Sequence, residues 1–201
     1  MVKKWFEEAI TDYADQARKH QAWIEEEGEV EHPTHLETLQ KPEQQARIDW
    51  LIRKCDSFNI LDIGCSWGYI LNMVKGKAGI DLNPENIELA RQKFPHLSFS
   101  VGDVTKRLDI PDQKYRIVIE ADILEHIEWS EVETALSEGL RIAWKKLLIT
   151  LPWEKKHAFN FKHKWVPDVF KLAQIIGWLI TRTKRVTIEC DGNFVYLEVI
   201  K

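Results

Sequence analysis

Residues 60–69, ILDIGCSWGY, contain the spacing G-x-S-x-G between Gly64 and Gly68. Such a stretch can support two kinds of chemistry. Ser66 would be the nucleophile of a hydrolase if it lay on a strained turn between a strand and a helix, with a histidine as base and an oxyanion hole from an earlier loop. Alternatively, the small residues would let the backbone bend tightly and bring its N–H groups against a ligand.

The hydrolase interpretation lacks a source for its oxyanion hole. Only one strand is expected before the motif, so no earlier βα loop exists, and no glycine-rich stretch lies upstream. His126, His157 and His163 follow the motif and leave a catalytic triad open. We therefore favour the interpretation of the loop as a cradle for a ligand.

Two aspartates indicate what that ligand contains. Asp81 ends the expected second strand, 17 residues after Gly64, where doubly wound folds place a carboxylate against ribose hydroxyls. Asp62 lies at the end of the first strand, where its charge would repel a pyrophosphate and attract a cation. The dinucleotide pattern G-x-G-x-x-G is not met, because Ser66 and Tyr69 occupy its second and third glycine positions. A ribose joined to a positive charge is found in S-adenosylmethionine, which has a sulfonium and an ammonium group.

The elements that position these residues begin at Phe58, where short apolar runs start to alternate with helical stretches. This alternation is typical of repeated βα units and a mainly parallel sheet. Two β-rich runs around residues 191–193, Asp-Gly-Asn, predict an antiparallel C-terminal hairpin. We predict an α/β fold with a doubly wound, Rossmann-like, seven-stranded sheet. Strands are expected at residues 58–64, 77–82, 97–102, 115–122, 146–152 and in the hairpin, and helices near 68–75, 84–94, 129–145 and 167–179.

Two helices are expected before the first strand, over residues 3–27 and 41–55. Together they would form an N-terminal helical cap, residues 1–55, in front of a ligand-binding domain at residues 56–201. From its position, the cap would close over the edge of the ligand and help to shape a pocket for a second substrate. Three of its aromatic residues are candidate contacts: Trp5, Tyr13 and Trp23.

The composition limits the class of protein. The chain has 201 residues, of which 44% are hydrophobic and 30% charged, as expected for a globular domain. Its net charge of −4 argues against general nucleic-acid binding. Cys55, Cys65 and Cys190 are far apart and odd in number, which favours reduced thiols. Because no run suits a membrane span or a signal peptide, we expect a cytoplasmic protein. The oligomeric state is not indicated.

The motifs resemble those of the class I S-adenosylmethionine-dependent methyltransferases, over about residues 58–200. LDIGCSWG resembles the first family motif, GIDLNPENIELAR the second and SFSVGDV the third, and YRIVIEADILEHI resembles the segment that faces the substrate. The resemblance implies S-adenosylmethionine as cofactor, with Asp81 on the ribose, Asp103 on the adenine amino group and Val104 on the adenine ring. The implied cofactor-binding residues are Asp62, Gly64, Cys65, Ser66, Gly68, Asp81, Leu82, Asp103, Val104 and Asp122.

The acceptor of the methyl group is less clearly indicated. A polar cluster ends the fourth strand, at the face where open α/β sheets place ligands: Glu120, Asp122, Glu125 and His126. His126 or His163 would be the general base for a hydroxyl acceptor. Residues 153–171 carry aromatic residues and a net charge of +3, which suits a lid over an anionic acceptor. We predict O- or N-methylation of a metabolite, sugar or natural product, and we assign no metal.

Two alternatives stay open. The RNA 3′-end ribose methyltransferases hold a divalent metal with Glu-x-x-Glu-His and a later histidine, and DILEH at 122–126 with His163 resembles that set, except that Asp122 replaces the first glutamate. The second alternative is a non-catalytic scaffold subunit that has kept the fold. The motif residues Asp62, Asp81 and Asp103 argue against such a loss of function.

Overall fold

The computed structural model describes residues 39–153, 163–165 and 167–201. The chain divides into two compact units, residues 1–40 and 41–201. The predicted helix at 3–27, the three aromatic residues proposed as cap contacts and most of the predicted lid lie outside the described residues. No helix among the described residues is long and apolar enough to cross a lipid bilayer.

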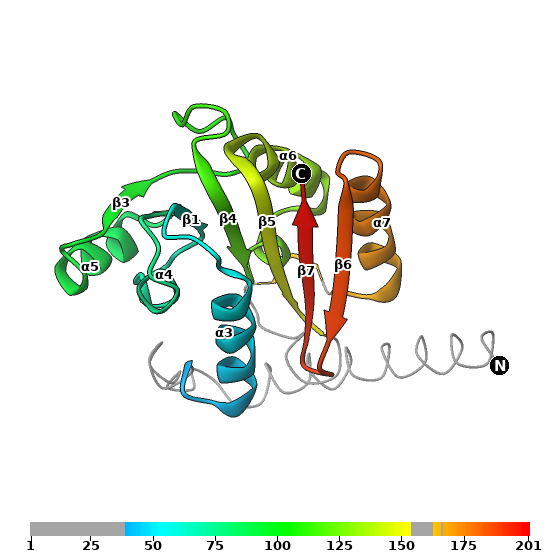
Figure 1. The fold of residues 1–201 in the computed structure, drawn as a ribbon, viewed down its shortest axis with the longest axis horizontal. Helices are drawn as coiled ribbons and strands as arrows, with labels where there is room; N and C mark the ends of the chain where they lie inside the picture. Colours follow the sequence, from blue (N-terminus) through cyan, green and yellow to red (C-terminus); the bar gives the residue numbers. More distant parts are fainter. Residues whose placement is uncertain (1–38, 154–162, 166) are drawn as a thin grey trace, which may run out of the picture. The chain divides into compact units, whose positions relative to one another are not determined.

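The second unit is built on a seven-stranded sheet with the order β3-β2-β1-β4-β5-β7-β6 (Figure 1). Neighbouring strands from β3 to β5 are parallel, and β7 lies antiparallel between β5 and β6. This arrangement confirms the predicted doubly wound fold with an antiparallel C-terminal hairpin. The strands are β1 (Ile60–Ile63), β2 (Ala78–Asp81), β3 (Ser98–Val101), β4 (Tyr115–Ala121), β5 (Ala143–Pro152), β6 (Arg185–Cys190) and β7 (Phe194–Ile200).

The helices lie close to their predicted positions. Helix α5 begins at Pro84, and its N-cap is Asn83, whose side-chain oxygen accepts a hydrogen bond from the backbone N–H of Glu85. The described helices are α3 (Pro42–Lys54), α4 (Tyr69–Met73), α5 (Pro84–Lys93), α6 (Val132–Ile142) and α7 (Val169–Ile180), with 3₁₀ turns η1 (Leu124–His126) and η2 (Trp129–Glu131).

The prediction of one helix over residues 129–145 was too long at both ends. Residues 129–131 form the separate turn η2, and α6 ends at Ile142. Ala143 has extended backbone angles and pairs with Tyr115 of β4, so β5 begins three residues before its predicted start at 146. The apolar pattern continues from α6 into β5, and the pairing of β5 with β4 determines where the helix ends and the strand begins.

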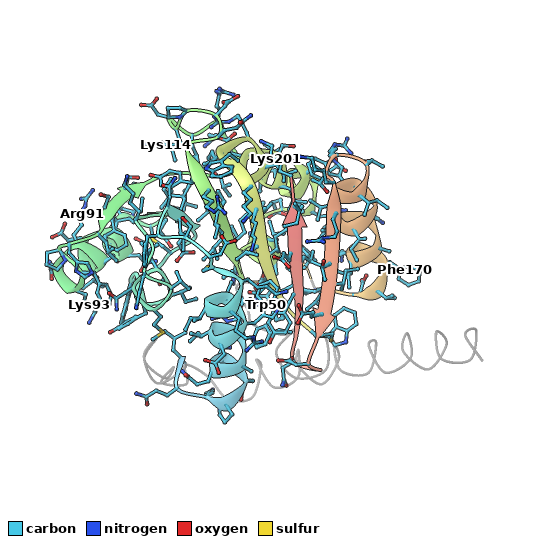
Figure 2. All side chains as sticks on the ribbon, viewed as in Figure 1. Trp50, Arg91, Lys93, Lys114, Phe170 and Lys201 are labelled. Atoms are coloured by element: carbon cyan, nitrogen blue, oxygen red, sulfur yellow. The ribbon has the colours of Figure 1, made fainter. Side chains whose placement is uncertain are left out.

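The sheet is covered on both faces, which explains why β4 and β5 read as nearly continuous apolar runs. On one face, Trp50 and Leu51 of α3 belong to a buried cluster with Ile117 and Ile119 of β4. Figure 2 shows Trp50 on this helix. Residues of α6 and α7 belong to the cluster on the other face, with Val118 and Leu147 among their strand partners. Helix α3, predicted as part of the cap, therefore packs directly on the sheet. The predicted domain boundary after residue 55 stays a prediction.

Strand β1 lies between β2 and β4, and the chain leaves it toward β2 and then β3 before crossing back to β4. Ligands of open α/β sheets bind outside the carboxyl ends of the strands at such a reversal. The carboxyl ends of β1, β2 and β4 carry most of the residues that the sequence predicts to be functional, whereas Asp103 and Val104 follow β3 and His163 follows β5.

Candidate functional site

The loop after β1 is shaped by two glycines. Gly64 and Gly68 have φ angles of +75° and +81°, in the left-handed region that glycine adopts at little cost. A Cβ atom on Gly64 would lie 2.0 Å from Cγ2 of Ile123, and one on Gly68 would lie 2.7 Å from Cζ of Phe99. Both positions therefore require glycine on conformational and on steric grounds.

The backbone of this loop is held by β2. The N–H groups of Gly64 and Cys65 both donate to the carbonyl of Ile80, at 2.7 and 2.9 Å. The N–H of Gly68 donates to the carbonyl of Cys65, and that of Ser66 donates to Asp81. These four N–H groups hold the loop in place, which differs from the expectation that they face a ligand. The two glycines allow the backbone of the loop to lie close to the side chains of Ile123 and Phe99.

Asp81 stands at the end of β2 and organises the neighbouring turns. Its Oδ2 accepts a hydrogen bond of 2.8 Å from the backbone N–H of Ser66. Its Oδ1 accepts from the backbone N–H of Asn83 at 2.9 Å and from the side-chain amide of Asn86 at 3.2 Å. A carboxylate offers about four acceptor sites, so Asp81 keeps acceptor capacity for a hydroxyl donor while it joins the β1 loop to α5.

Asp62 is the most unusual group of the site. It is 2% exposed, and its Oδ2 has no hydrogen-bond partner among the described residues. Burial is the main reason why the pKa of Asp62 rises to about 7, while the positive charge of Arg47 opposes that rise and the negative charge of Asp81 adds to it. A buried carboxyl oxygen that no described residue pairs, beside a glycine loop, is suited to a cationic group of a ligand.

Asp122 has a left-handed backbone at the end of β4, with φ of +54°. Its side chain accepts hydrogen bonds from Oγ1 of Thr150, at 2.6 Å, and from Nη1 of Arg47. Asp122 thus joins β5 to α3 at the carboxyl end of β4. The sequence predicted Asp122 as a site residue but missed Arg47 and Thr150. A signal for Arg47 existed, because it shares the buried face of α3 with Ile48, Trp50 and Leu51.

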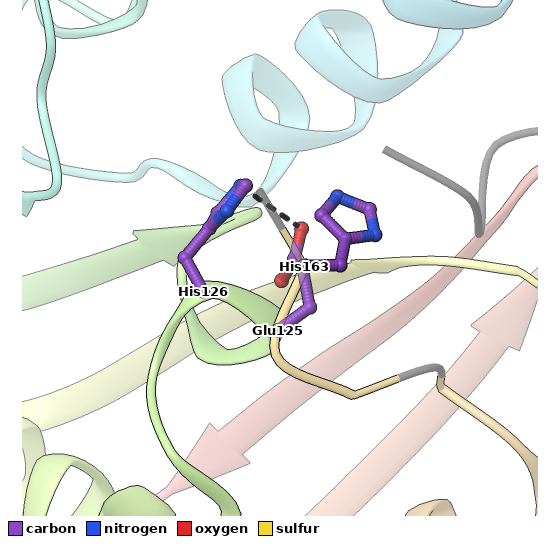
Figure 3. A group of neighbouring side chains, drawn as sticks. All are labelled: Glu125, His126 and His163. Atoms are coloured by element: carbon purple, nitrogen blue, oxygen red, sulfur yellow. Dashed lines mark ion pairs between the residues drawn. The ribbon is translucent and has the colours of Figure 1, made fainter. Parts of the chain in front are cut away.

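Glu125 and His126 of η1 come together with His163 (Figure 3). One ligand atom from each lies within 4.8 Å of the others. Nε2 of His126 is 4.0 Å from Oε1 of Glu125, and the two imidazole centroids are 4.8 Å apart. Glu125 is 1% exposed, and burial together with the charge of Asp122 raises its pKa. This arrangement could move a proton or hold a divalent cation.

His163 is far from the other two residues in sequence, and backbone contacts place it there. The N–H of Lys164 donates to the carbonyl of Glu125 at 2.7 Å. The indole N–H of Trp165 is shared between the carbonyls of Leu124 and Ile127, at 3.0 and 3.1 Å. Residues 163–165 are therefore fastened to η1, which brings His163 close to His126.

The remaining predicted cofactor residues differ in environment. Leu82 is 68% exposed after β2, whereas Val104 is buried in the cluster that includes Ile80. Asp103 accepts hydrogen bonds from Thr105, and an ion pair with Lys106 contributes to a lowered pKa of this carboxyl. Cys65 is buried, and burial raises the pKa of its thiol, as expected for an unreactive packing residue.

Sequence comparison places a known domain over the centre of the chain. Residues 60–144, which run from β1 into β5, match the profile described as a methyltransferase domain. No significant match was found among curated proteins. The matched region includes the β1 loop, Asp62, Asp81 and the cluster at η1, and it favours the cradle over the hydrolase interpretation of residues 64–68.

Solved structures of methyltransferases share the fold. An S-adenosylmethionine-dependent methyltransferase from Aquifex aeolicus is 18% identical, with 85% of this chain and 99% of that chain covered and a TM-score of 0.62. Magnesium protoporphyrin IX methyltransferase from Synechocystis PCC 6803, with bound S-adenosylhomocysteine, is 15% identical over 97% of this chain and 99% of that chain, with a TM-score of 0.63. The methyltransferase domain of bacterial CtHen1-C is 12% identical over 78% and 97%, with a TM-score of 0.63.

Proposed function

We propose that this chain, which carries a class I S-adenosylmethionine-dependent methyltransferase domain, binds S-adenosylmethionine in the β1–β2–β4 crevice and methylates an oxygen or nitrogen of a small-molecule acceptor. In this assignment Asp81 accepts hydrogen bonds from the ribose and Asp62 binds the ammonium of the methionine moiety. Leu82, Asp103 and Val104 would contact the adenine. The bound cofactor would supply the methyl group and a leaving group already activated by its positive charge.

The observation that carries the proposal is the buried Oδ2 of Asp62, which has no partner among the described residues although it sits beside the β1 loop. A buried carboxylate without a partner is costly, and a cationic ligand would remove that cost. Asp81 stands one strand away on β2, which is paired in parallel with β1. A nucleoside joined to an amino acid has a hydroxyl pair and an ammonium group to match these two aspartates.

The protein itself mainly positions the reactants, because methyl transfer from a sulfonium needs little further activation. For a hydroxyl acceptor, His126 or His163 would accept the proton, with the buried Glu125 orienting the imidazole. The net charge of −4 and the similarity to magnesium protoporphyrin IX methyltransferase support a small-molecule acceptor. The positive charge of residues 153–171 supports an anionic one.

Calorimetric titration with S-adenosylmethionine and S-adenosylhomocysteine tests the cofactor assignment. Binding with protection against thermal unfolding is the expected result. The absence of binding heat, together with an unchanged melting temperature, would favour the non-catalytic scaffold. Metabolite pools incubated with methyl-labelled cofactor would then identify the acceptor. Transfer that is lost in His126→Ala or His163→Ala, but kept in the exposed His96→Ala control, would support the general-base role.

A second candidate is an RNA 3′-end ribose methyltransferase that uses a metal. Two features support it: the grouping of Glu125, His126 and His163, and the similarity in fold to the domain of bacterial CtHen1-C. The residues present suit a divalent cation, because Glu125 is buried and its Oε2 has no partner among the described residues. The metal would polarise the terminal ribose hydroxyls. Asp122, the fourth expected ligand, is bound instead by Arg47 and Thr150.

Titration with Mn²⁺, followed by electron paramagnetic resonance, separates the two candidates. The metal candidate predicts a bound ion that disappears in His126→Ala and in His163→Ala and persists in His96→Ala. It also predicts methyl transfer to the 3′ end of a short RNA that EDTA abolishes. The metal-dependent function would be excluded if all the Mn²⁺ stayed unbound at every concentration and if EDTA did not inhibit methyl transfer to a small molecule. The histidines would then be candidates for the general base alone.

A further inference from the structure

Arg47 places a buried positive charge at the carboxyl end of the sheet. The residue is 5% exposed, although it belongs to a helix. Its Nη1 donates to Asp122, and its guanidinium lies 5.4 Å from the ring centroid of Phe194. Its Nε is buried and has no hydrogen-bond partner among the described residues. Buried N–H groups in proteins are nearly always paired, so this donor points to a ligand.

The charge of Arg47 acts on both strand ends that form the crevice. It lowers the pKa of Asp62 at the end of β1, against the effect of burial. Its direct partner, Asp122, ends β4, the strand next to β1. Arg47 thus acts on carboxyl groups of two neighbouring strands where the order of the strands reverses. One bond to Asp122 leaves most of its five N–H donors for other acceptors.

The cofactor would bring a matching group to this position. Its methionine moiety carries an ammonium and a carboxylate on the same carbon atom, so a site that binds the ammonium places the carboxylate close by. Asp62 suits the ammonium, and other carboxyl groups in the crevice would repel the carboxylate. A planar guanidinium can bind a carboxylate through two N–H groups at once. Arg47 is close enough to Asp62 for its charge to be felt there.

We propose that Arg47 binds the α-carboxylate of the cofactor through Nε–H and a second guanidinium N–H, while Asp122, which also accepts a hydrogen bond from Thr150, holds the guanidinium in place. This inference rests on the proposed function, since it assigns a residue to one end of the same cofactor. Helix α3 would then be part of the cofactor site. Residues 41–54 precede the matched methyltransferase domain, which explains why the family motifs do not include Arg47.

A pair of ligands tests the assignment. S-adenosylhomocysteine carries the amino-acid carboxylate, whereas 5′-methylthioadenosine keeps the adenosine and the sulfur but lacks the amino-acid end. Calorimetric titration of both ligands would be carried out on the wild type, Arg47→Ala and Arg47→Lys. Arg53→Ala is the matched control, because Arg53 lies exposed on the same helix.

Arg47→Ala should weaken binding of S-adenosylhomocysteine by about 10- to 150-fold, the change expected when charge-assisted hydrogen bonds are lost. Binding of methylthioadenosine should change less than about twofold, which also shows that the variant is folded at the site. Arg47→Lys keeps the charge but not the planar guanidinium, so its affinity for S-adenosylhomocysteine should lie between the affinities of Arg47→Ala and the wild type. Arg53→Ala should bind both ligands as the wild type does.

Equal losses for both ligands in Arg47→Ala would overturn the inference, because they would mean that Arg47 only braces α3 against β4. Unchanged affinity for both ligands would overturn the inference as well. It would mean that the guanidinium is available to bind the methyl acceptor instead of the cofactor. Failure of the wild type to bind either ligand is a different result. It would contradict the proposed function itself.

Discussion

The buried carboxyl of Asp62 should make the empty protein less stable than an amide at the same position would. Its pKa rises from the ordinary value of 3.8 to about 7. A group whose pKa is raised on folding contributes its full stability below the pKa of the unfolded chain, and that contribution is lost as the pH rises through the folded value. Asp62 should therefore destabilise the fold increasingly between pH 4 and pH 7.

The size of the effect follows from the pKa shift. A shift of about 3 pKa units corresponds to about 4 kcal/mol of unfolding free energy at pH 8, where Asp62 is ionised in both states. At pH 5 the same linkage gives about 1.5 kcal/mol. Asp62→Asn removes this titration while it keeps the shape of the side chain. The gain in stability of Asp62→Asn over the wild type should therefore grow by about 2.5 kcal/mol from pH 5 to pH 8.

Urea unfolding of both proteins at several pH values measures this difference. Because Glu120 and Glu125 are present in both, their titrations cancel in the comparison. With the cofactor bound, the wild type should be more stable than Asp62→Asn, since the ammonium of the cofactor would bind ionised Asp62 and lower the pKa of this carboxyl. The wild-type Kd for S-adenosylhomocysteine should then fall about thirtyfold from pH 5.5 to pH 8. Asp62→Asn should bind weakly at both pH values.

Two results would refute this reasoning. The first is an Asp62→Asn protein that is less stable than the wild type at pH 8, which would mean that the carboxylate already has a stabilising partner. The second is a stability difference that does not change between pH 5 and pH 8. Either outcome would show that Asp62 is not held as a buried acceptor for a cation.

Three further perturbations test other parts of the site. Asp81→Ala should weaken S-adenosylhomocysteine binding by about 1.5–3 kcal/mol, and an unchanged Kd in calorimetry would remove the ribose assignment. Gly64→Ala should lower the unfolding free energy by about 1–3 kcal/mol, because its Cβ would meet Ile123 at 2.0 Å with φ at +75°; wild-type stability in urea would contradict the geometry. Glu120→Gln should raise stability by an amount that grows from about pH 4.5 to pH 8 and should leave the Kd unchanged, since burial raises the pKa of Glu120 to about 8 and its Oε1 faces Gly139; a pH-independent difference in melting temperature from the wild type would contradict this.

The fold could be predicted because its elements leave local signals. The positions of the strands were predicted from apolar runs that alternate with helical stretches. Asn83 and Pro84 indicated the start of α5. Asp191-Gly192 marked the hairpin between β6 and β7. The end of α6 could not be predicted, because the apolar pattern continues past Ile142 and the change to extended backbone depends on pairing with β4.

The positions of Asp62 and Asp81 near the strand ends were predictable, because both residues adjoin apolar runs in the sequence. Arg47 shares the apolar face of its helix, which is a signal for burial, but its contact with Asp122 could not be predicted, because the helix comes before the first motif and only tertiary packing makes that contact. The burial of Asp62 was likewise invisible, although it determines the behaviour of the carboxyl. The use of the loop N–H groups as structural donors also depends on β2, which supplies the carbonyl of Ile80.

A diffraction structure of the protein with S-adenosylhomocysteine tests the central claim most directly. The account predicts that the ribose hydroxyls lie within hydrogen-bond distance of Asp81 and that the ammonium is bound at Oδ2 of Asp62. A ligand bound elsewhere on the protein, or one bound in the crevice with its ammonium pointing away from Asp62, would contradict it.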